Sequence, residues 1–369
     1  MTLGSDTLRV VLAGGGTAGH VEPALALADA LLRKDPDTSV TALGTERGLE
    51  TRLVPERGYE LALIPPVPVP RRPTVELLSL PGRLRAAVRA VEEVLDRTGA
   101  DVLVGFGGYV AAPAYLAAAR RHLPYVVHEA NVRAGWANRL GARRARYVAA
   151  ASSACRLHGS RLVGMPLRRA ISTLDRSAVR EEARAMFGLV PDRPVLLVTG
   201  GSQGARRLNA AVAGAAADLS GASVQVLHLA GPRANPADID SEVGSGFVVL
   251  DFCDRMDLAY AAADFVLCRG GAMTVAELTA VGLGAAYVPL PIGNGEQRLN
   301  ALPVVAAGGG LLVDDEACTP SWIRSRLLPL VSNPSRTQAM GQAASRLGRR
   351  DGDERLADLV RAAAKEGAR

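Results

Sequence analysis

The chain has 369 residues, of which 48% are hydrophobic, 22% charged and 4% aromatic. This length predicts two domains, because a domain usually holds roughly 100 to 200 residues, and it argues against a single small binding module. Lys34 and Lys365 are the only lysines. A P-loop nucleotidase is therefore excluded, because its glycine-rich loop must be followed by a lysine.

The charge is divided unevenly along the chain. Residues 1–170 contain 23 basic and 15 acidic residues, whereas residues 171–369 contain 20 and 22. Residues 132–169 alone contain nine arginines and no Asp or Glu. A surface of this kind attracts the phosphates of nucleic acid, of an anionic lipid or of a phosphorylated substrate.

The cysteines and apolar segments exclude several other classes. The four cysteines show no C-x-x-C spacing, so the sequence predicts a reduced, cytosolic setting and no metal site. The N-terminal apolar run, 8–13, is too short for a signal peptide. Glycines and prolines interrupt the uncharged runs 102–119 and 278–295, so neither is expected to cross a membrane.

In chain order, an apolar run at 8–13 predicts a strand that passes through glycines into a helix beginning near Val21. The same order recurs as a strand at 195–199, a glycine turn at 200–206 and a helix at 208–219. Two such openings predict two α/β domains with doubly wound parallel sheets. We expect the linker near 164–175. The remaining predicted strands are 40–43, 61–64, 102–104, 125–127 and 147–149 in the first half, and 224–229, 248–250, 265–267, 286–288 and 311–313 in the second.

The first glycine segment, GGGTAGH at 14–20, matches G-x-G-x-x-G, which lets a helix N-terminus approach a diphosphate. A bound dinucleotide would need an acidic residue at the end of the second strand, and the nearest, Glu46, lies beyond Gly44. His20 follows the loop at once and suits a general base. It could equally cap the helix or contact a phosphate.

Four further segments lie where ligands bind, beyond the carboxyl ends of predicted strands or at helix starts. In RGGAMTVAE, Glu277 could accept hydrogen bonds from a ribose diol, or only complement the helix dipole. Buried His and Asn of HEAN could equally tie loops together. The sequence predicts no metal and no cofactor. The four segments are HEAN (128–131), GGSQGAR (200–206), RGGAMTVAE (269–277) and GNGEQRLNA (293–301).

Taken together, GGGTAGH, GFGGYVAAP, HEAN, GGSQGAR, CRGGAMTVAE and EQRLNA resemble, in this order and spacing, the motifs of the MurG family of glycosyltransferases, family 28. The resemblance implies a GT-B fold, with two Rossmann-like doubly wound domains that face each other across a cleft. It places an acceptor and membrane-facing domain at 1–165 and a UDP-GlcNAc domain at 166–344, with a final helix, about 345–369, packing back on the first.

The resemblance also implies a reaction. N-Acetylglucosamine is transferred from UDP-GlcNAc to the C4 hydroxyl of the muramoyl sugar of undecaprenyl-pyrophosphoryl-MurNAc-pentapeptide (lipid I), which gives lipid II. The transfer inverts the anomeric centre and needs neither metal nor cofactor. We expect His20 to be the catalytic base.

The site residues carried over from the family fall into two groups. The donor, UDP-GlcNAc, would contact Thr17, Ala18, Gly19, Asn131, Arg168, Ser202, Gln203, Gly204, Cys253, Ala272, Met273, Thr274, Glu277 and Gln297. The acceptor side would contain Gly15, Gly16, Tyr109, His128 and Glu129. This sequence departs from the family's usual residues at Ala18 (Gly), Met165 (Asn) and Glu296 (Gln).

Residues 67–90 combine leucines with arginines and suggest a surface that dips into an anionic bilayer. The alternative is an ordinary amphipathic helix after Pro81. We expect a peripheral protein at the cytoplasmic face of the membrane, compatible with a cell-wall synthesis complex. The residues predicted to face the membrane are Arg71, Arg72, Leu77, Leu78, Leu80, Arg83 and Arg85.

Three alternatives remain open at this point. Another GT-B enzyme would use a different lipid acceptor, and an acceptor assay would distinguish it. An NAD-dependent oxidoreductase would bind NADH rather than UDP. A nucleic-acid binder would explain the arginines, although the chain has few aromatic residues on which bases could stack, so no nucleic-acid partner is expected.

Overall fold

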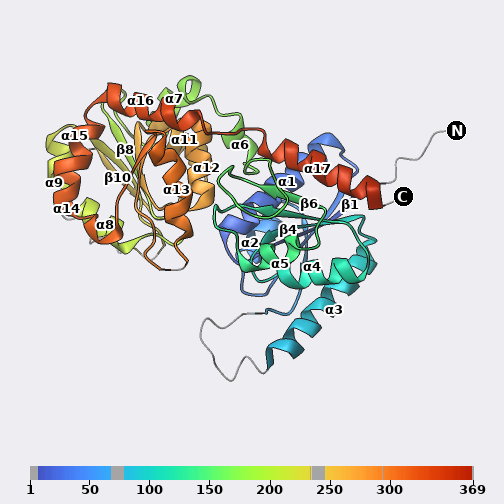
Figure 1. The fold of residues 1–369 in the computed structure, drawn as a ribbon. Helices are drawn as coiled ribbons and strands as arrows, with labels where there is room; N and C mark the ends of the chain where they lie inside the picture. The colour runs from blue at the N-terminus through green and yellow to red at the C-terminus, as the bar shows by residue number, and fades with distance from the viewer. Residues whose placement is uncertain (1–6, 68–78, 233, 235–245, 293, 368–369) are drawn as a thin grey trace. The chain divides into compact units, whose positions relative to one another are not determined.

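The computed structural model describes residues 7–67, 79–232, 234, 246–292 and 294–367 (Figure 1). The chain forms two compact units: unit 1 comprises 1–168 and 351–369, and unit 2 comprises 169–350. The chain therefore passes between them at 168/169 and again at 350/351. The first crossing lies inside the segment 164–175 that the sequence suggested as a linker.

Unit 1 is built on a parallel sheet with the order β3-β2-β1-β4-β5-β6-β7. The predicted strands form within two residues of their expected positions, except that the strand predicted at 102–104 continues three residues further, to Gly107. The last strand was not predicted, because it is short, lies at the sheet edge and has no apolar run. The strands are β1 Arg9–Gly14, β2 Ser39–Gly44, β3 Glu60–Leu63, β4 Val102–Gly107, β5 Tyr125–Glu129, β6 Tyr147–Ala150 and β7 Ser160–Leu162.

Helices cover both faces of this sheet, which explains why its central strands read as continuous apolar runs. Val11 and Ala13 pack against α3, α4 and α5, whereas Val10 and Leu12 pack against α1 and α17. Alternate residues of one strand thus belong to two separate cores. The helices of unit 1 are α1 Ala18–Lys34, α2 Glu50–Glu56, α3 Leu80–Thr98, α4 Ala111–Arg120, α5 Trp136–Ala142 and α17 Gly352–Gly367.

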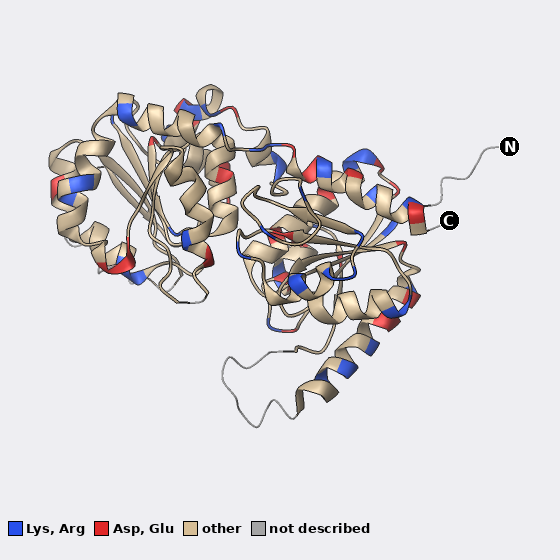
Figure 2. Ribbon diagram, in the orientation of Figure 1, with Lys and Arg blue, Asp and Glu red and all other residues tan. Residues whose placement is uncertain are grey.

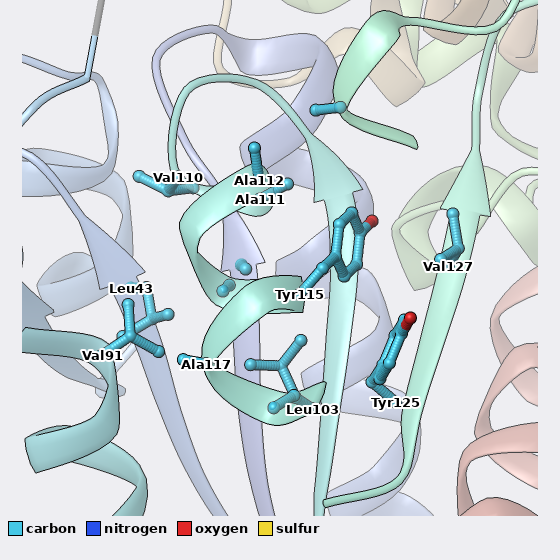
Figure 3. Packing of buried hydrophobic residues seen from close by; sticks show 14 of the residues in the cluster. Leu43, Val91, Leu103, Val110, Ala111, Ala112, Tyr115, Ala117, Tyr125 and Val127 are labelled. Carbon is cyan, nitrogen blue, oxygen red and sulfur yellow. The ribbon is translucent and has the colours of Figure 1, made fainter. Parts of the chain in front are cut away.

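Tyr115 of α4 is a large buried side chain between the helices and the sheet (Figure 3). A Cβ atom on Gly105 of β4 would overlap its ring, so only glycine fits at that point of the strand. The Tyr115 hydroxyl donates to Asn138 Oδ1 on α5 at 2.7 Å. This bond joins α4 to α5, the helix that follows the HEAN segment at the end of β5.

The C-terminal helix α17 returns to unit 1 and packs along α1. Arg33 of α1 forms a 2.5 Å ion pair with Asp353, whose side chain is 3% exposed. Leu356 and Val360 are fully buried in the same core as β1. In the part of the chain that the structure describes, no helix is long and apolar enough to cross a membrane.

Unit 2 repeats the same plan with the parallel order β10-β9-β8-β11-β12-β13. Its strands are β8 Val195–Thr199, β9 Gln225–Leu229, β10 Phe247–Leu250, β11 Phe265–Cys268, β12 Ala285–Tyr287 and β13 Gly310–Leu312. Its α-helices are α6 Arg169–Ser172, α7 Arg176–Met186, α8 Arg206–Ala213, α9 Ala216–Gly221, α11 Met256–Ala262, α12 Ala272–Val281, α13 Glu296–Ala306, α14 Pro320–Trp322, α15 Leu328–Val331 and α16 Pro334–Ser345, with 3₁₀ and π turns at Asp315–Ala317 and Ile323–Leu327.

The prediction of one continuous helix over 208–219 was wrong. The chain forms α8 and α9 instead, with the break at Gly214. A Cβ at Gly214 would lie 2.7 Å from Pro320, so the turn brings the backbone close to α14. The apolar periodicity continues across the break and therefore could not reveal it.

In both sheets the strand order reverses beside the first strand, between β1 and β4 and between β8 and β11. Loops at the carboxyl ends of such neighbouring strands flank the position where ligands bind in open α/β sheets. The glycine loops that follow β1 and β8 lie at these two positions.

Two buried histidines predict how stability depends on pH. His128 in unit 1 and His228 in unit 2 are 0% exposed, and burial lowers the pKa of each to about 4. Because the unfolded chain binds these protons near pH 6.5, the stability that neutral histidines contribute is complete above that pH and is lost as pH falls towards 4.

We expect His228→Gln to reduce this pH dependence. Between pH 7 and pH 5, the free energy of unfolding of the wild type should fall by about 2 kcal/mol more than that of the variant. Urea unfolding at both pH values, followed by circular dichroism, measures this difference. Equal losses in the two proteins would contradict the assignment.

Candidate functional site

The glycine loop of unit 1 joins β1 to α1. Thr17 is the extended N-cap of α1, and its carbonyl accepts hydrogen bonds from the N–H groups of His20 and Val21. Among the described residues, only His122 and Ser223 combine a side chain with positive φ. Ala18, the first residue of α1, therefore replaces the family's glycine without backbone strain.

His20 is half-buried against the loop that follows β4. Its Nδ1 lies 3.2 Å from Thr17 Oγ1, and a Cβ on Gly107 would lie 3.2 Å from Nε2. Burial lowers the pKa of the ring, while a hydrogen bond to the Gly15 backbone and the charge of Glu50 oppose that shift. The imidazole is therefore neutral at pH 7 and can accept a proton.

Glu50, at the start of α2, was missed by the sequence reasoning, which considered only Glu46. Glu46 is exposed, whereas Glu50 is fully buried and accepts a hydrogen bond from Gly16 N–H at 2.8 Å. The sequence feature that could have revealed Glu50 is a carboxylate preceded within a few residues by two glycines, in LGTERGLE. The carboxylate oxygens of Glu50 already accept hydrogen bonds from backbone N–H groups. Glu50 therefore does not present the free carboxylate that the ribose of a dinucleotide would need.

The HEAN segment places its two ionisable side chains below the surface. His128 Nε2–H donates to the Gly164 carbonyl at 2.9 Å. Glu129 accepts hydrogen bonds from the backbone N–H groups of Asn131 and Gly135 and from Asn138 Nδ2, at 2.9 to 3.0 Å. Burial of both side chains leaves them supporting the loop that carries Asn131.

The side chain of Tyr109 differs, because it is 49% exposed in the loop after β4. Gly16, Thr17 and Gly19 are exposed too, at the loop after β1. These two loops follow neighbouring strands of the sheet. The structure thus brings Tyr109 and Gly16, predicted for the acceptor side, to the same edge of unit 1 as His20 and the predicted donor contacts Thr17 and Gly19.

In unit 2, the GGSQG loop turns tightly between β8 and α8. Ser202 and Gln203 are exposed at its tip, and Gly204 N–H donates to Gly201 O at 2.9 Å. A Cβ on Gly204, whose φ is +70°, would overlap the Ala230 carbonyl oxygen of the next loop. The loop therefore lies directly on the segment after β9, beside the N-terminus of an eight-residue helix whose N–H groups suit an anion.

The α12 helix begins in the RGGA segment after β11. Ala272, Met273 and Thr274 form its partly exposed first turn. Glu277 lies one turn further and is 7% exposed, and its Oε2 accepts a hydrogen bond from the Tyr260 hydroxyl at 2.8 Å. This bond fixes the orientation of the carboxylate.

The start of α13 packs against the same RGGA loop. A Cβ on Gly270 would overlap the Gln297 carbonyl oxygen, and Asn300 Nδ2 donates to the Gly270 carbonyl at 3.3 Å. The Gln297 side chain accepts from Leu290 N–H at 3.0 Å. Glu296, a departure from the family pattern, is the first residue of α13, where a carboxylate complements the helix dipole.

The remaining predicted donor residues lie apart from these loops in the chain. Cys253 is buried in the loop between β10 and α11. Arg168 is the last residue of the first segment of unit 1, and its Nε lies 3.9 Å from Glu22 Oε2 on α1. The structure thus groups Arg168 with unit 1, although the sequence placed it in the second domain. Among the described residues, no cluster of His, Cys, Asp and Glu could hold a metal ion.

Two doubly wound units, each with a glycine loop at the point where its strand order reverses, define the GT-B class of glycosyltransferase fold. Residues 10–150 match the glycosyltransferase family 28 N-terminal domain, and residues 195–356 match the C-terminal domain of the same family. The chain belongs to glycosyltransferase family 28, and it is a glycosyltransferase.

Its relatives match it along nearly the whole length. The UDP-N-acetylglucosamine–N-acetylmuramyl-(pentapeptide) pyrophosphoryl-undecaprenol N-acetylglucosamine transferase of Streptomyces coelicolor is 62% identical over 96% of this chain and 97% of its own. The protein of the same name from Nocardia farcinica is 58% identical over 96% and 95%.

Solved structures agree with this fold. Acinetobacter baumannii MurG has a TM-score of 0.78 at 27% identity, over 96% of this chain and 99% of its own. The calicheamicin glycosyltransferase CalG4 has a TM-score of 0.70 at 19% identity, over 99% and 100% of the two chains, and shows the common fold alone.

The close approach of the GGSQG loop to its neighbour gives a test by substitution. Gly201 and Gly204 both have positive φ, but a Cβ on Gly201 would have nothing within 4 Å. We expect Gly201→Ala to destabilise unit 2 by about 1 to 2 kcal/mol through backbone strain, and Gly204→Ala by about 1 to 3 kcal/mol more through overlap with Ala230. Denaturant unfolding of both variants measures the difference, and equal losses would contradict this packing.

Proposed function

We propose that this enzyme transfers N-acetylglucosamine from UDP-GlcNAc to the C4 hydroxyl of the muramoyl sugar of lipid I, giving lipid II. The main support for the proposal is the similarity to relatives named for this transfer, which are 62% identical over 96% of this chain. The site geometry supports it, because unit 2 offers groups for a nucleotide diphosphate and unit 1 offers a neutral imidazole.

On the donor side, the diphosphate would lie at Ser202–Gly204, where exposed loop groups meet the N-terminus of α8. Glu277, held by Tyr260, would accept hydrogen bonds from the ribose hydroxyls. The first turn of α12 and the backbone of Cys253 would contact the rest of the nucleoside, and Gln297 the sugar. Arg168 would approach the nucleotide from unit 1.

On the acceptor side, His20 would act as the general base. With the proton on Nδ1, which lies 3.2 Å from Thr17 Oγ1, the Nε2 lone pair is able to take a proton. The C4 hydroxyl would lose its proton to Nε2 as its oxygen bonds to C1, while the bond from C1 to UDP breaks. Helix N-terminal N–H groups and Ser202 would stabilise the charge that develops on UDP.

The other residues of unit 1 would position the two sugars. Thr17, Ala18, Gly19 and Asn131 would approach the donor sugar. Gly15, Gly16 and Tyr109 would meet the acceptor, and His128 and Glu129 would support the loop that holds Asn131. The proposed transfer has no metal-dependent step and no cofactor.

Two substitutions should separate catalysis from donor binding, because one should lower turnover and the other should weaken the binding of UDP. His20→Ala should lower kcat by roughly 10²- to 10⁴-fold, the usual contribution of a general base, with little change in UDP affinity. Glu277→Gln should weaken UDP binding about 10- to 100-fold, because a hydrogen bond to a charged group contributes about 1.5 to 3 kcal/mol. Steady-state kinetics with a lipid I analogue and calorimetry with UDP measure the two effects.

Tyr260→Phe serves as the control for the second variant, since it keeps the carboxylate and removes only its hydrogen-bonding partner. It should weaken UDP binding less than Glu277→Gln does. Unchanged turnover in His20→Ala would remove His20 from the role of base. Transfer to other lipid acceptors but not to lipid I would contradict the proposed reaction.

We also propose that the N-terminal turns of α3 contact the cytoplasmic face of an anionic membrane. Arg85 and Arg89 are exposed there, and no acidic residue of the helix precedes Glu92 (Figure 2). The rest of the helix, from Ala87 onwards, buries an apolar face as an ordinary amphipathic helix. Leu80 and Arg83 are half-buried near its start.

Part of the predicted membrane surface lies outside the described residues, namely Arg71, Arg72, Leu77 and Leu78. The described acidic groups of α3 lie nearer its C-terminal end. Two of them, Glu92 and Asp96, pair with Arg120 and Arg121 of unit 1. The exposed positive charge of the helix is therefore concentrated at its start, where it would face anionic headgroups.

Reversing this charge should weaken membrane binding. We expect Arg85→Glu combined with Arg89→Glu to reduce binding to vesicles rich in anionic lipid at least 10-fold, since each basic residue near such a surface contributes about 1 kcal/mol. Arg97→Glu, on the last turn of the same helix, is the matched control and should bind as the wild type does. Equal binding by all three proteins in a sedimentation assay would overturn this orientation.

A further inference from the structure

Glu50 lies at the junction of three segments of unit 1. It is the first residue of α2, and its side chain is 0% exposed. Burying a carboxylate is strongly unfavourable unless donors replace the lost water. The contacts of Glu50 therefore indicate what the residue holds in place.

Both carboxylate oxygens of Glu50 accept hydrogen bonds from loop backbone. Oε2 accepts from Gly16 N–H at 2.8 Å. Oε1 accepts from Thr45 N–H at 2.9 Å and from Thr45 Oγ1 at 3.2 Å. One side chain thus links the glycine loop after β1 to the turn after β2.

Glycines enclose this carboxylate. A Cβ atom on Gly44 or Gly48 would overlap the Glu50 side chain, and one on Gly15 would lie 2.9 Å from Oε1. The three glycines come from the loop after β1, the end of β2 and the turn before α2. Side chains at these positions would displace the carboxylate, so this part of the fold is shaped around it.

We infer that Glu50 is a positioning residue for the transfer reaction, which holds the Gly15–Gly16 backbone and thereby fixes His20 at the start of α1. The inference rests on the proposed role of His20 for its effect on turnover. Glu50 itself does not reach a substrate, because its side chain is completely buried.

The charge of Glu50 also acts on the imidazole. Burial lowers the pKa of His20, and Glu50 raises it together with the hydrogen bond from the ring to the Gly15 backbone. Among the described residues, uncharged groups also lie beside the ring: Thr17 on its own segment and Gly107 and Gly108 on the loop after β4. Removing the carboxylate charge should therefore lower the pKa of His20.

Two substitutions separate the charge of Glu50 from its position. In Glu50→Gln, one oxygen becomes an NH₂ group that faces a backbone N–H, so one of the two loops loses its acceptor. In Glu50→Asp, the charge remains but the shorter side chain cannot reach both Gly16 and Thr45 in the same geometry. Asp353→Asn is the matched control, because Asp353 is also buried but holds the other end of α1 through Arg33.

The experiment measures the titration of His20 by NMR in protein labelled with ¹³C-histidine, using His20→Gln to assign its resonance. Glu50→Gln should move the His20 midpoint to lower pH and reduce kcat about 10- to 100-fold, with the KM for UDP-GlcNAc within about twofold. Glu50→Asp should lower kcat while the midpoint stays near that of the wild type. Asp353→Asn should change neither.

An unchanged His20 midpoint and unchanged kcat in Glu50→Gln would overturn the inference. If Glu50→Gln does not fold, the Glu50→Asp variant provides the test. A folded Glu50→Asp protein with wild-type kcat would overturn the inference, and one with reduced kcat and unchanged donor KM would support it. Failure of the proposed base is recognised separately. In that case His20→Ala keeps full turnover, while Glu50→Gln still shifts the His20 resonance.

Discussion

Hydrogen bonds from loop N–H groups to two buried carboxylates, Glu50 and Glu129, are the interaction on which the candidate site of unit 1 depends. The loops after β1, β2 and β5 lie beyond the sheet and do not form its strand-to-strand hydrogen bonds, so their N–H groups need other partners. Glu50 serves the first two loops, and Glu129 serves the third. These bonds hold the backbone that carries His20 and Asn131, and the two side chains add contacts of their own to Thr17 and Glu129.

Unit 2 fixes its loops by a different means, which suits its proposed ligand. Gly204 lies against the backbone of Ala230, and Gly270 lies against that of Gln297. Side-chain bonds such as Gly201 N–H to Thr199 Oγ1 add to this packing. The helices α8 and α12 have no side-chain N-cap, so their first N–H groups can meet an anion. The loop of unit 1 instead uses Gly16 N–H internally, with a carboxylate behind it. The two similar glycine motifs therefore differ in how the protein itself holds them.

Much of the candidate site could be predicted from the sequence, because the glycines and His20 come shortly after apolar runs that form strands, and Glu277 lies in the helix that follows such a run. Carboxyl ends of parallel strands meet at one edge, so chain order alone places these residues near a ligand. The break at Gly214 could not be predicted, because the apolar periodicity continues through it. The sequence left open whether His128 is buried, because its partner, the Gly164 carbonyl, lies 36 residues further along the chain.

The sequence by itself determined the two α/β units, their strands along the chain and the position of each glycine loop, because periodicity and turn residues are local properties of the chain. Only the tertiary structure decided which carboxylate stabilises the first loop. Glu46 and Glu50 are four residues apart, and both follow the second strand. The fold exposes one and encloses the other between glycines, because only Glu50 can reach the N–H groups of Gly16 and Thr45 at once. That geometry depends on the pairing of β1 with β2, which no local pattern specifies.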